Sequence, residues 1–166
     1  MAETKTNAVR IVESHHIPYA LHAYASKEAV DDVAESGRLG VIIAEKLGIP
    51  VEAVFKTLVT QGSDHNHYVF VVPAEEHLDL KACARAVGVK AVEMIPQKEL
   101  LKTTGYIHGG CSPIGMKKKF VTVYDETIVL FDTVLVSGGR VGLQVEVAPD
   151  DLLKITDGVT APIGID

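Results

Sequence analysis

The strongest constraint on the fold lies in residues 54–73, which read VFKTLVTQGSDHNHYVFVVP. Two apolar runs rich in β-branched residues flank a short polar turn that contains Gly, Ser, Asp and Asn. Runs of this kind around such a turn are typical of an antiparallel hairpin. The segment therefore predicts two neighbouring strands of one sheet.

Helical and strand-like segments follow one another irregularly along the rest of the chain. Helical patterns occur at 4–17, 36–49, 78–88, 95–105 and 149–156, and further β-rich runs lie at 19–25, 119–125, 132–139 and 141–149. Because the strands and helices do not follow a regular βαβ order, we predict an α+β fold with a mixed sheet and not a doubly wound parallel sheet.

The sequence gives local detail for three of the predicted helices. Two carry candidate caps, and the pattern of the third indicates which of its residues face the core. Thr4 or Thr6 would cap the first helix, and Ser36 would cap the second. In the third helix, at 78–88, we expect the inward face to carry Leu80, Cys83, Ala84 and Val87.

Composition and charge narrow the class of protein. A chain of 166 residues with 47% hydrophobic and 23% charged residues suits one globular domain, which we place at residues 1–166. The formal net charge of −6 argues against nucleic-acid binding driven mainly by global charge. A local basic patch at Lys117, Lys118 and Lys119 is still compatible with that charge.

No apolar run approaches the ~20 residues needed to cross a bilayer, and the amino-terminal residues lack the apolar region of a signal peptide. We therefore expect a cytoplasmic protein without a membrane partner. Cys83 and Cys111 form no close-spaced metal motif, and a disulfide between them is not expected in a reducing cytosol. His65 and His67 share a turn, but zinc needs three or four ligands, so no metal or other cofactor is predicted.

Lys56 is the first candidate site residue. Strand alternation places Val54, Lys56 and Leu58 on one face, and Phe55, Thr57 and Val59 on the other. A lysine in such a strand either lies on a solvated face or points into a cleft. In a partly apolar cleft the ammonium needs an anion such as a phosphate or a carboxylate.

The second candidate is the loop GGCSPIG at 109–115. Glycines let backbone N–H groups approach a ligand closely, and such donors can stabilise a carbonyl oxygen that becomes negative. A glycine-rich turn between strands is an equally good interpretation of the composition. Cys111 with His108 would make a thiol nucleophile, although a small packing residue is the commoner role of a single cysteine in apolar surroundings.

Gln144 is the third candidate, in the glycine-punctuated segment VSGGRVGLQVEV. Glycines such as Gly138 and Gly139 let a sheet edge approach a ligand or another backbone. Gln144 could then lie in a cleft as an amide donor and acceptor, or on the surface of an alternating strand. The composition of the segment around Gln144 leaves both interpretations open.

Several of these segments together resemble the YbaK/EbsC family, whose members are free-standing relatives of the editing domain of bacterial prolyl-tRNA synthetases. The segments are FKTLV, LDLKACARAVGVKAVEM, TGYIHGGCSPIGMKKK, VSGGRVGLQVEV and DLLKIT, and the similarity runs from about Tyr19 to the last helix. The resemblance implies a mixed, partly barrel-like sheet surrounded by helices.

The resemblance also implies roles for residues. Lys56 and Thr57 match the family's KTL segment, which holds the substrate, and Tyr24 matches a pocket tyrosine. The loop from Gly109 through Gly110, Cys111 and Ser112 to Pro113 matches a G-x-x-x-P motif whose amides face the scissile carbonyl. Further substrate contacts are expected from the polar and glycine positions Gly138, Gln144, Lys117 and Lys118.

The implied activity is an aminoacyl-tRNA deacylase that acts in trans, above all on Cys-tRNA(Pro), with a synthetase as a potential partner. The implied route uses no protein nucleophile and relies on positioning and oxyanion stabilisation. Gln144 departs from the aspartate or histidine that relatives carry there, and an amide cannot take up a proton. An alternative is therefore a non-catalytic module that binds tRNA or a synthetase, and a weaker one is a thiol enzyme built on Cys111 and His108.

Overall fold

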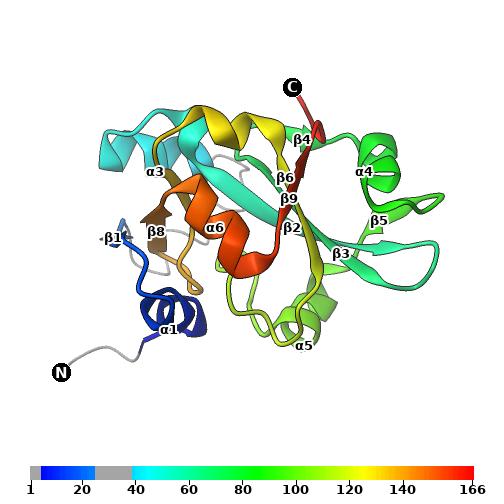
Figure 1. The fold of residues 1–166 in the computed structure, drawn as a ribbon, viewed down its shortest axis with the longest axis horizontal. Coiled ribbons are helices and arrows are strands. Elements are labelled where there is room, and N and C mark those ends of the chain that lie inside the picture. Colours follow the sequence, from blue (N-terminus) through cyan, green and yellow to red (C-terminus); the bar gives the residue numbers. More distant parts are fainter. Residues whose placement is uncertain (1–4, 25–38) are drawn as a thin grey trace.

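The computed structural model describes residues 5–24 and 39–166, and its strands and helices are mixed along the chain (Figure 1). The strands are β1 (Tyr19–Ala23), β2 (Phe55–Gly62), β3 (His67–Pro73), β4 (His77–Leu78), β5 (Val92–Met94), β6 (Val121–Asp125), β7 (Val134–Ser137), β8 (Leu143–Val147), β9 (Val159–Ala161) and β10 (Gly164–Ile165). The α-helices are α1 (Asn7–Ser14), α3 (Leu39–Leu47), α4 (Leu80–Val87), α5 (Leu100–Thr104) and α6 (Pro149–Thr156). Short 3-10 helices are η1 (Val51–Ala53), η2 (Gln97–Glu99) and η3 (Glu126–Leu130).

The largest sheet has the strand order β5-β2-β3-β6-β9. The predicted hairpin is its centre, because β2 pairs antiparallel with β3 from Phe55 opposite Pro73 to Gln61 opposite His67. Strand β6 pairs parallel with β3, and β9 pairs parallel with β6, so the sheet is mixed. The prediction of an α+β fold with a mixed sheet is confirmed.

A second, antiparallel sheet has the order β1-β8-β7, and β4 pairs with β10 in a small ribbon. A parallel bridge between Val54 and Leu135 joins the start of β2 to β7. The two larger sheets therefore form an open, partly barrel-like arrangement.

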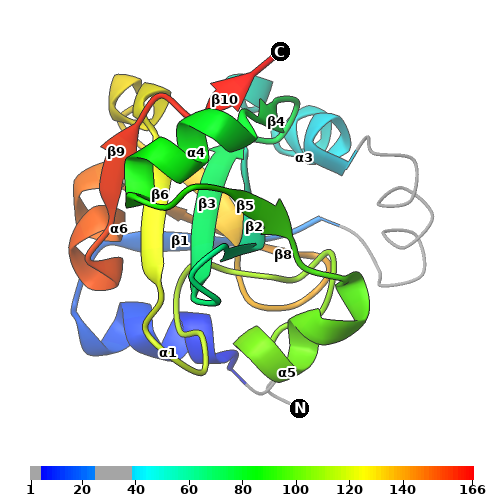
Figure 2. The same ribbon diagram turned by 90° about the vertical axis from the view of Figure 1, so that its right-hand side faces the viewer.

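The five-stranded sheet is covered on both faces. Figure 2 shows α4 in front of this sheet and β1 and β8 behind it. Alternation along β3 explains both layers, since Phe70 and Val72 pack with Cys83 of α4, whereas Val69 and Val71 pack in the core that includes β7 and β8. Residues on opposite sides of β2 therefore face different surroundings.

Most helix boundaries follow from caps visible in the sequence. Thr6 accepts a hydrogen bond from the Val9 N–H and caps α1, as predicted, whereas the alternative cap Thr4 and the predicted cap Ser36 lie outside the described residues. Gly88 ends α4 in the left-handed conformation with φ of +75°.

One prediction about α4 is wrong. Leu80 was expected on the inward face, but it is 41% exposed, and the buried residues are Ala82, Cys83 and Ala84. Leu80 is the first residue of α4 and does not join the core cluster in which Cys83 and Ala84 pack.

Within residues 5–24 and 39–166, no helix is both long and apolar enough to cross a membrane.

Candidate active site

A pocket of about 280 Å³ lies beside the first half of β2. Helix α3, the loop that precedes Ser112 and the facing ends of β7 and β8 form its other walls. Its polar lining comprises Lys56, Thr57, His108, Cys111, Ser137 and Gln144. Its apolar lining comprises Leu39, Ile43, Val54, Phe55, Leu58, Ala74 and Leu100.

Two glycine-rich loops meet at the pocket, backbone against backbone. A Cβ atom on Gly110 would lie 2.9 Å from both the Arg140 carbonyl carbon and the Val141 nitrogen, so only glycine fits there without a shift. Gly109 has φ of +84°, in the region that favours glycine. Within the described part of the chain, the N–H groups of Cys111 and Ser112 donate to no other group.

The start of α1 holds both loops through hydrogen bonds to their backbone carbonyls. The Thr6 hydroxyl donates to the Gly138 carbonyl at 2.6 Å, and the Asn7 side-chain amide donates to the Gly115 carbonyl at 2.5 Å. The Tyr106 hydroxyl donates to the Ile114 carbonyl at 2.6 Å from inside the core. These bonds fix the loop backbone without a residue of α1 in the pocket wall.

Three buried polar atoms lack a hydrogen-bond partner among the described residues: the Tyr24 hydroxyl, the Thr57 hydroxyl and the Gln144 side-chain oxygen. Gln144 is 4% exposed and Tyr24 is 7% exposed. A buried polar atom without a partner costs free energy. Thr57 and Gln144 line the pocket, so their unpartnered atoms indicate that a ligand supplies the partners, whereas Tyr24 is not among the residues that line it.

Tyr24 and Gln144 lie near each other. Burial raises the pKa of the Tyr24 hydroxyl, and the neighbouring Gly142 amide and Gln144 side chain offset part of that rise. Neither neighbour completes a hydrogen bond of ordinary geometry to the hydroxyl. Both side chains are therefore neutral groups that can bond to a ligand.

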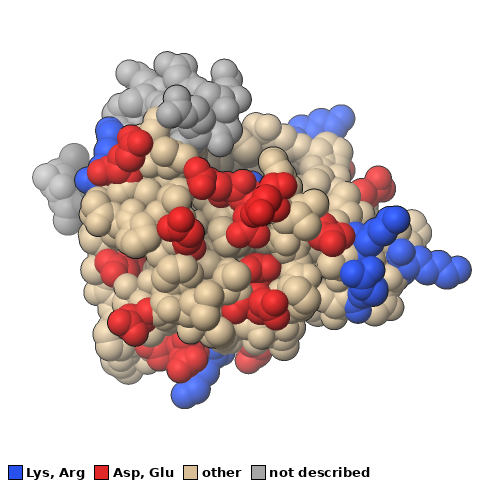
Figure 3. All heavy atoms as spheres, turned by 90° about the horizontal axis from the view of Figure 1, so that it is seen from above, with Lys and Arg blue, Asp and Glu red and all other residues tan. Residues whose placement is uncertain are grey.

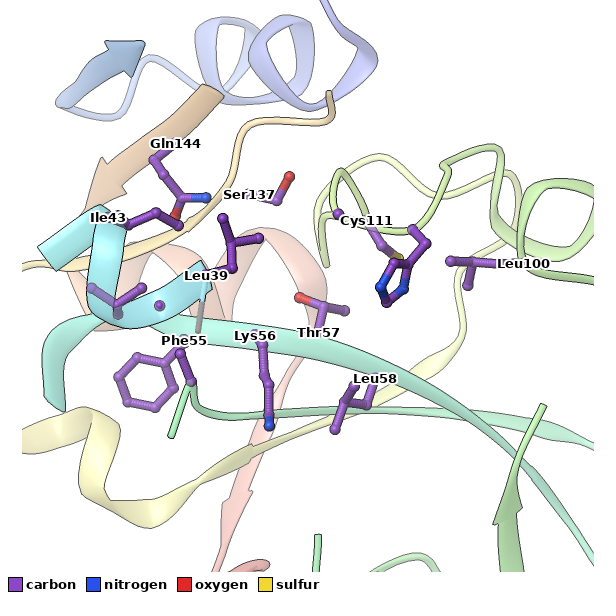
Figure 4. A pocket seen from close by; sticks show the side chains of 15 residues that line it. Leu39, Ile43, Phe55, Lys56, Thr57, Leu58, Leu100, Cys111, Ser137 and Gln144 are labelled. Carbon is purple, nitrogen blue, oxygen red and sulfur yellow. The ribbon is translucent and has the colours of Figure 1, made fainter. Parts of the chain in front are cut away.

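Lys56 and Thr57 leave β2 on opposite sides, as alternation predicts. Figure 4 shows Thr57 on the side of Cys111, whereas the Lys56 side chain extends away from Cys111, Ser137 and Gln144. Lys56 thus lines the pocket, but its ammonium does not converge with the glycine loop. Burial lowers the pKa of the Lys56 ammonium, and the charge of Glu76 raises it in part.

The side chains of the glycine loop have structural surroundings. Cys111 is 8% exposed, and burial raises the pKa of its thiol to about 12, so the thiol is protonated near neutral pH. The fully buried Ser112 hydroxyl accepts a hydrogen bond from the Ile114 N–H at 3.2 Å. Pro113 is also buried. These side chains shape the loop and provide no activated nucleophile.

Other predicted site residues lie outside the pocket lining. Lys117 and Lys118 are exposed, and the Lys117 ammonium donates to the Lys102 carbonyl at 3.4 Å. Lys119 forms an ion pair with Asp157. The Gly138 backbone bonds to Leu143 and Thr6 and supports the β7–β8 turn next to Ser137.

Sequence reasoning missed several pocket residues. Ser137 is buried and lines the pocket one position before the double glycine, and Leu100 lines it from α5. Leu39 and Ile43 contribute the wall from α3, whose apolar run was visible as a helix. Which face of that helix meets β2 depends on tertiary packing and carries no local signal.

Comparison with known proteins identifies the family to which the chain belongs. The model of the aminoacyl-tRNA editing domain matches residues 41–155, which include β2, both glycine loops and Gln144. The chain belongs to the aminoacyl-tRNA editing domain family.

A relative in Enterococcus faecalis, named "Putative Cys-tRNA(Pro)/Cys-tRNA(Cys) deacylase EbsC", is 45% identical over 161 residues, which cover 97% of this chain and 94% of the relative. A proline–tRNA ligase of Burkholderia thailandensis is 24% identical over 83% of this chain, which spans 25% of that larger protein.

Among solved structures, one described as "a putative trans-editing enzyme for prolyl tRNA synthetase" has a TM-score of 0.78 and 23% identity. The match covers 99% of this chain and 100% of the other. At this identity the likeness shows a shared fold.

Proposed function

We propose that this protein is a trans-acting aminoacyl-tRNA deacylase that removes the amino acid from mischarged tRNA, with Cys-tRNA(Pro) as its main substrate and Cys-tRNA(Cys) as a second one. The observation that carries the proposal is the 45% identity, over 94% of its length, to a relative whose name gives these substrates. The whole of residues 1–166 would act as one editing domain.

The glycine loop would stabilise the transition state. The N–H groups of Cys111 and Ser112 have no described acceptor, and the close packing of Gly110 on the Arg140–Val141 backbone keeps the loop rigid. Rigid donors of this kind stabilise the oxygen of the ester carbonyl as it gains negative charge. Pro113 would add stiffness to the same loop.

The unpartnered polar groups would hold the aminoacyl end. The Gln144 oxygen can accept a hydrogen bond from the α-ammonium of the amino acid, and the Thr57 and Tyr24 hydroxyls can bond to the ester or the ribose. As a neutral amide, Gln144 would position the substrate and would not exchange a proton with it.

Basic residues would hold the phosphates of the acceptor end. The half-buried Lys56 ammonium makes no ion pair within the described residues and is carried by a long, flexible side chain, so it can move to the terminal phosphate. Lys117 and Lys118 are exposed beyond the loop, where they can attract the acceptor stem. The Gly138 backbone would support the loop that carries Ser137 toward the substrate.

For a cysteinyl substrate, the attacking group would be the substrate's own thiol. The sulfur attacks the ester carbonyl carbon, the bond from that carbon to the ribose oxygen breaks, and the thiol proton ends on that oxygen. The products are a cyclic thioester of cysteine and free tRNA. This route needs no nucleophile from the protein. It is consistent with a Cys111 thiol that stays protonated and a Ser112 hydroxyl that is hydrogen-bonded within the loop.

The test is a single-turnover deacylation assay with Cys-tRNA(Pro), Ala-tRNA(Pro) and Pro-tRNA(Pro). We expect rapid loss of cysteine and much slower loss of proline. Binding of the same tRNAs is measured on the same preparation, because binding without ester cleavage would instead identify a non-catalytic module. Repeating the assay with prolyl-tRNA synthetase tests the proposed partnership, which predicts stronger preference for tRNA(Pro) when the synthetase is present.

A further inference from the structure

The amino-terminal end of α1 contacts both glycine loops, although the described pocket lining contains no residue of this helix. The Asn7 amide donates to the Gly115 carbonyl at 2.5 Å, and the Thr6 hydroxyl donates to the Gly138 carbonyl at 2.6 Å. Two adjacent residues therefore hold two loops that lie far apart in the sequence.

A chain of hydrogen bonds leads from Asn7 to Ser112. The Tyr106 hydroxyl lies 2.6 Å from the Ile114 carbonyl and 3.3 Å from the Gly115 carbonyl. Because a hydroxyl carries one hydrogen, the shorter bond takes it, and Asn7 is the main donor to Gly115. The Ile114 N–H in turn donates to the Ser112 hydroxyl at 3.2 Å. The backbone conformation at Ser112 thus depends on contacts that begin at Asn7.

A shorter chain leads from Thr6 to Ser137. The Thr6 hydroxyl accepts from the Val9 N–H at 3.1 Å and donates to Gly138, so one side chain joins the helix cap to the loop. Ser137 lines the pocket directly before Gly138, and its hydroxyl accepts from the Gly139 N–H at 3.2 Å. A Cβ atom on Gly139 would lie 3.0 Å from the Thr6 Cβ, so this loop packs closely on Thr6.

The core joins the two chains. Ala8 and Val12 of α1 are fully buried in the same apolar cluster as Tyr106 and Ile114. The Tyr106 ring also contacts the second loop, since a Cβ atom on Gly139 would lie 3.1 Å from it. A shift of α1 would therefore disturb both loops together.

Building on the proposed function, we infer that Thr6 and Asn7 are positioning residues for the deacylation reaction. They keep the N–H donors of Cys111 and Ser112 at a fixed separation from the pocket residue Ser137. Oxyanion donors accelerate a reaction when they are already in place, and a small displacement caused by a remote change slows it. Thr6 and Asn7 would thus raise kcat without touching the substrate.

The first test is Asn7→Asp, which keeps the shape of the side chain but places an oxygen against the Gly115 carbonyl instead of a donor. A carboxylate in the first turn of a helix is favourable, so α1 should stay folded and Tm should not fall. In steady-state assays with Cys-tRNA(Pro), we expect kcat to fall by about three- to tenfold, with KM changed by less than about twofold.

Arg10→Gln is the matched control, because it makes the same change of charge at an exposed position of α1. This match is needed because added negative charge weakens RNA binding, and Figure 3 shows acidic side chains already gathered on one face of the molecule. Arg10→Gln should retain the wild-type kcat. Equal losses of kcat in both variants would overturn the inference, as would a wild-type kcat in Asn7→Asp.

A second pair of variants tests the other chain. Thr6→Val removes the hydroxyl that bonds to Gly138, whereas Thr6→Ser retains it. Because this hydroxyl also caps α1, both variants are assayed at a temperature at which circular dichroism shows them fully folded. We expect a similar loss of kcat in Thr6→Val and near-complete rescue in Thr6→Ser. An equal loss in the two variants contradicts a role for the hydroxyl.

A measurement without substrate separates this inference from the proposed function. The buried Ile114 N–H, bonded to Ser112, reports on loop order through its hydrogen exchange in NMR spectra. Exchange should be about fivefold faster in Asn7→Asp than in the wild type or in Arg10→Gln. Unchanged exchange would refute the positioning role even in an active enzyme. Faster exchange in a wild-type background that cleaves no ester would refute the deacylase proposal alone.

Discussion

The two sides of β2 differ in how they can recognise a ligand. On one side Thr57 faces the glycine loop, together with neutral groups such as Gln144 and Ser137. On the other side lies the half-buried Lys56 ammonium, whose pKa is lowered by burial and raised in part by the charge of Glu76. One strand therefore separates hydrogen-bonding recognition from recognition by charge.

This difference suggests that the two sides of β2 have separate functions in recognition. Neutral, buried groups discriminate by geometry, because a misplaced ligand leaves them without partners. An ammonium attracts any phosphate, and the attraction weakens with salt. Chemistry and amino-acid selection would then depend on the Thr57 side, and RNA affinity on the Lys56 side.

The largest expected effect comes from the glycine loop. Gly110→Ala forces the loop away from the Arg140–Val141 backbone, which a new Cβ would approach to 2.9 Å. Because displaced oxyanion donors cost roughly 10²–10³ in rate, we expect kcat for Cys-tRNA(Pro) to fall by about that factor. Single-turnover deacylation measures it.

Gly88→Ala is the matched control for Gly110→Ala. Gly88 has φ of +75° and an added Cβ would meet nothing within 4 Å, so the change should cost about 1 kcal/mol of stability without loss of activity. Full activity in Gly110→Ala would exclude a role for the loop geometry in catalysis.

The next effect concerns the charged side. Lys56→Ala removes the half-buried ammonium, and since bonds to charged groups are worth about 1.5–3 kcal/mol, kcat/KM should fall by roughly tenfold to a hundredfold. The salt dependence of tRNA binding should also become shallower, as expected for the loss of one phosphate contact. Lys81→Ala, an exposed lysine on α4, is the control. Equal effects of the two substitutions would contradict a specific role for Lys56.

A smaller effect should appear on the neutral side. Thr57→Val removes a hydroxyl without a described partner, so the free energy of unfolding should stay the same or rise by about 1 kcal/mol. Deacylation should slow by about two- to tenfold if this hydroxyl bonds to the substrate.

Thr60→Val, on the same strand, should show the reverse pattern. The Thr60 hydroxyl donates to the Tyr68 carbonyl at 2.9 Å, so its loss should lower stability by about 1 kcal/mol and leave activity unchanged. Thermal unfolding and deacylation rates of the two variants decide the comparison. A stability loss in Thr57→Val would show that its hydroxyl has a partner in the protein.

The smallest effect is expected at Cys111. With a thiol pKa of about 12, Cys111 is protonated across the working pH range and should not act as a nucleophile. Cys111→Ala should therefore retain activity within about threefold. Treating the wild-type enzyme with iodoacetamide at pH 8, and removing the reagent before Cys-tRNA(Pro) is added, should leave the rate unchanged. Loss of nearly all activity in this variant would revive the thiol-enzyme hypothesis.

Local sequence patterns predicted much of the fold. The hairpin of β2 and β3, the cap at Thr6 and the stop at Gly88 all depend on neighbouring residues, and each is present. The short strands β5, β9 and β10 were missed because they pair with distant segments and have no strong pattern of their own. Similarly, the exposure of Leu80 depends on where α4 meets the sheet.

The candidate site shows the same limit. Alternation placed Lys56 and Thr57 on opposite faces, but the sequence could not reveal which face met the glycine loop. The close contact of Gly110 with the Arg140–Val141 backbone joins segments thirty positions apart in the chain, and Ser137 lines the same pocket as Cys111 although the two are distant in sequence. Such proximity follows from sheet packing and not from spacing.

The attachment of α1 to both glycine loops has a practical consequence. Thr6 and Asn7 bond to the Gly138 and Gly115 carbonyls, and neither residue lines the pocket. A purification tag or proteolytic trimming at this end could therefore alter turnover while leaving every substrate-facing side chain intact. Kinetic comparisons of variants should accordingly use chains with one and the same amino-terminal extension.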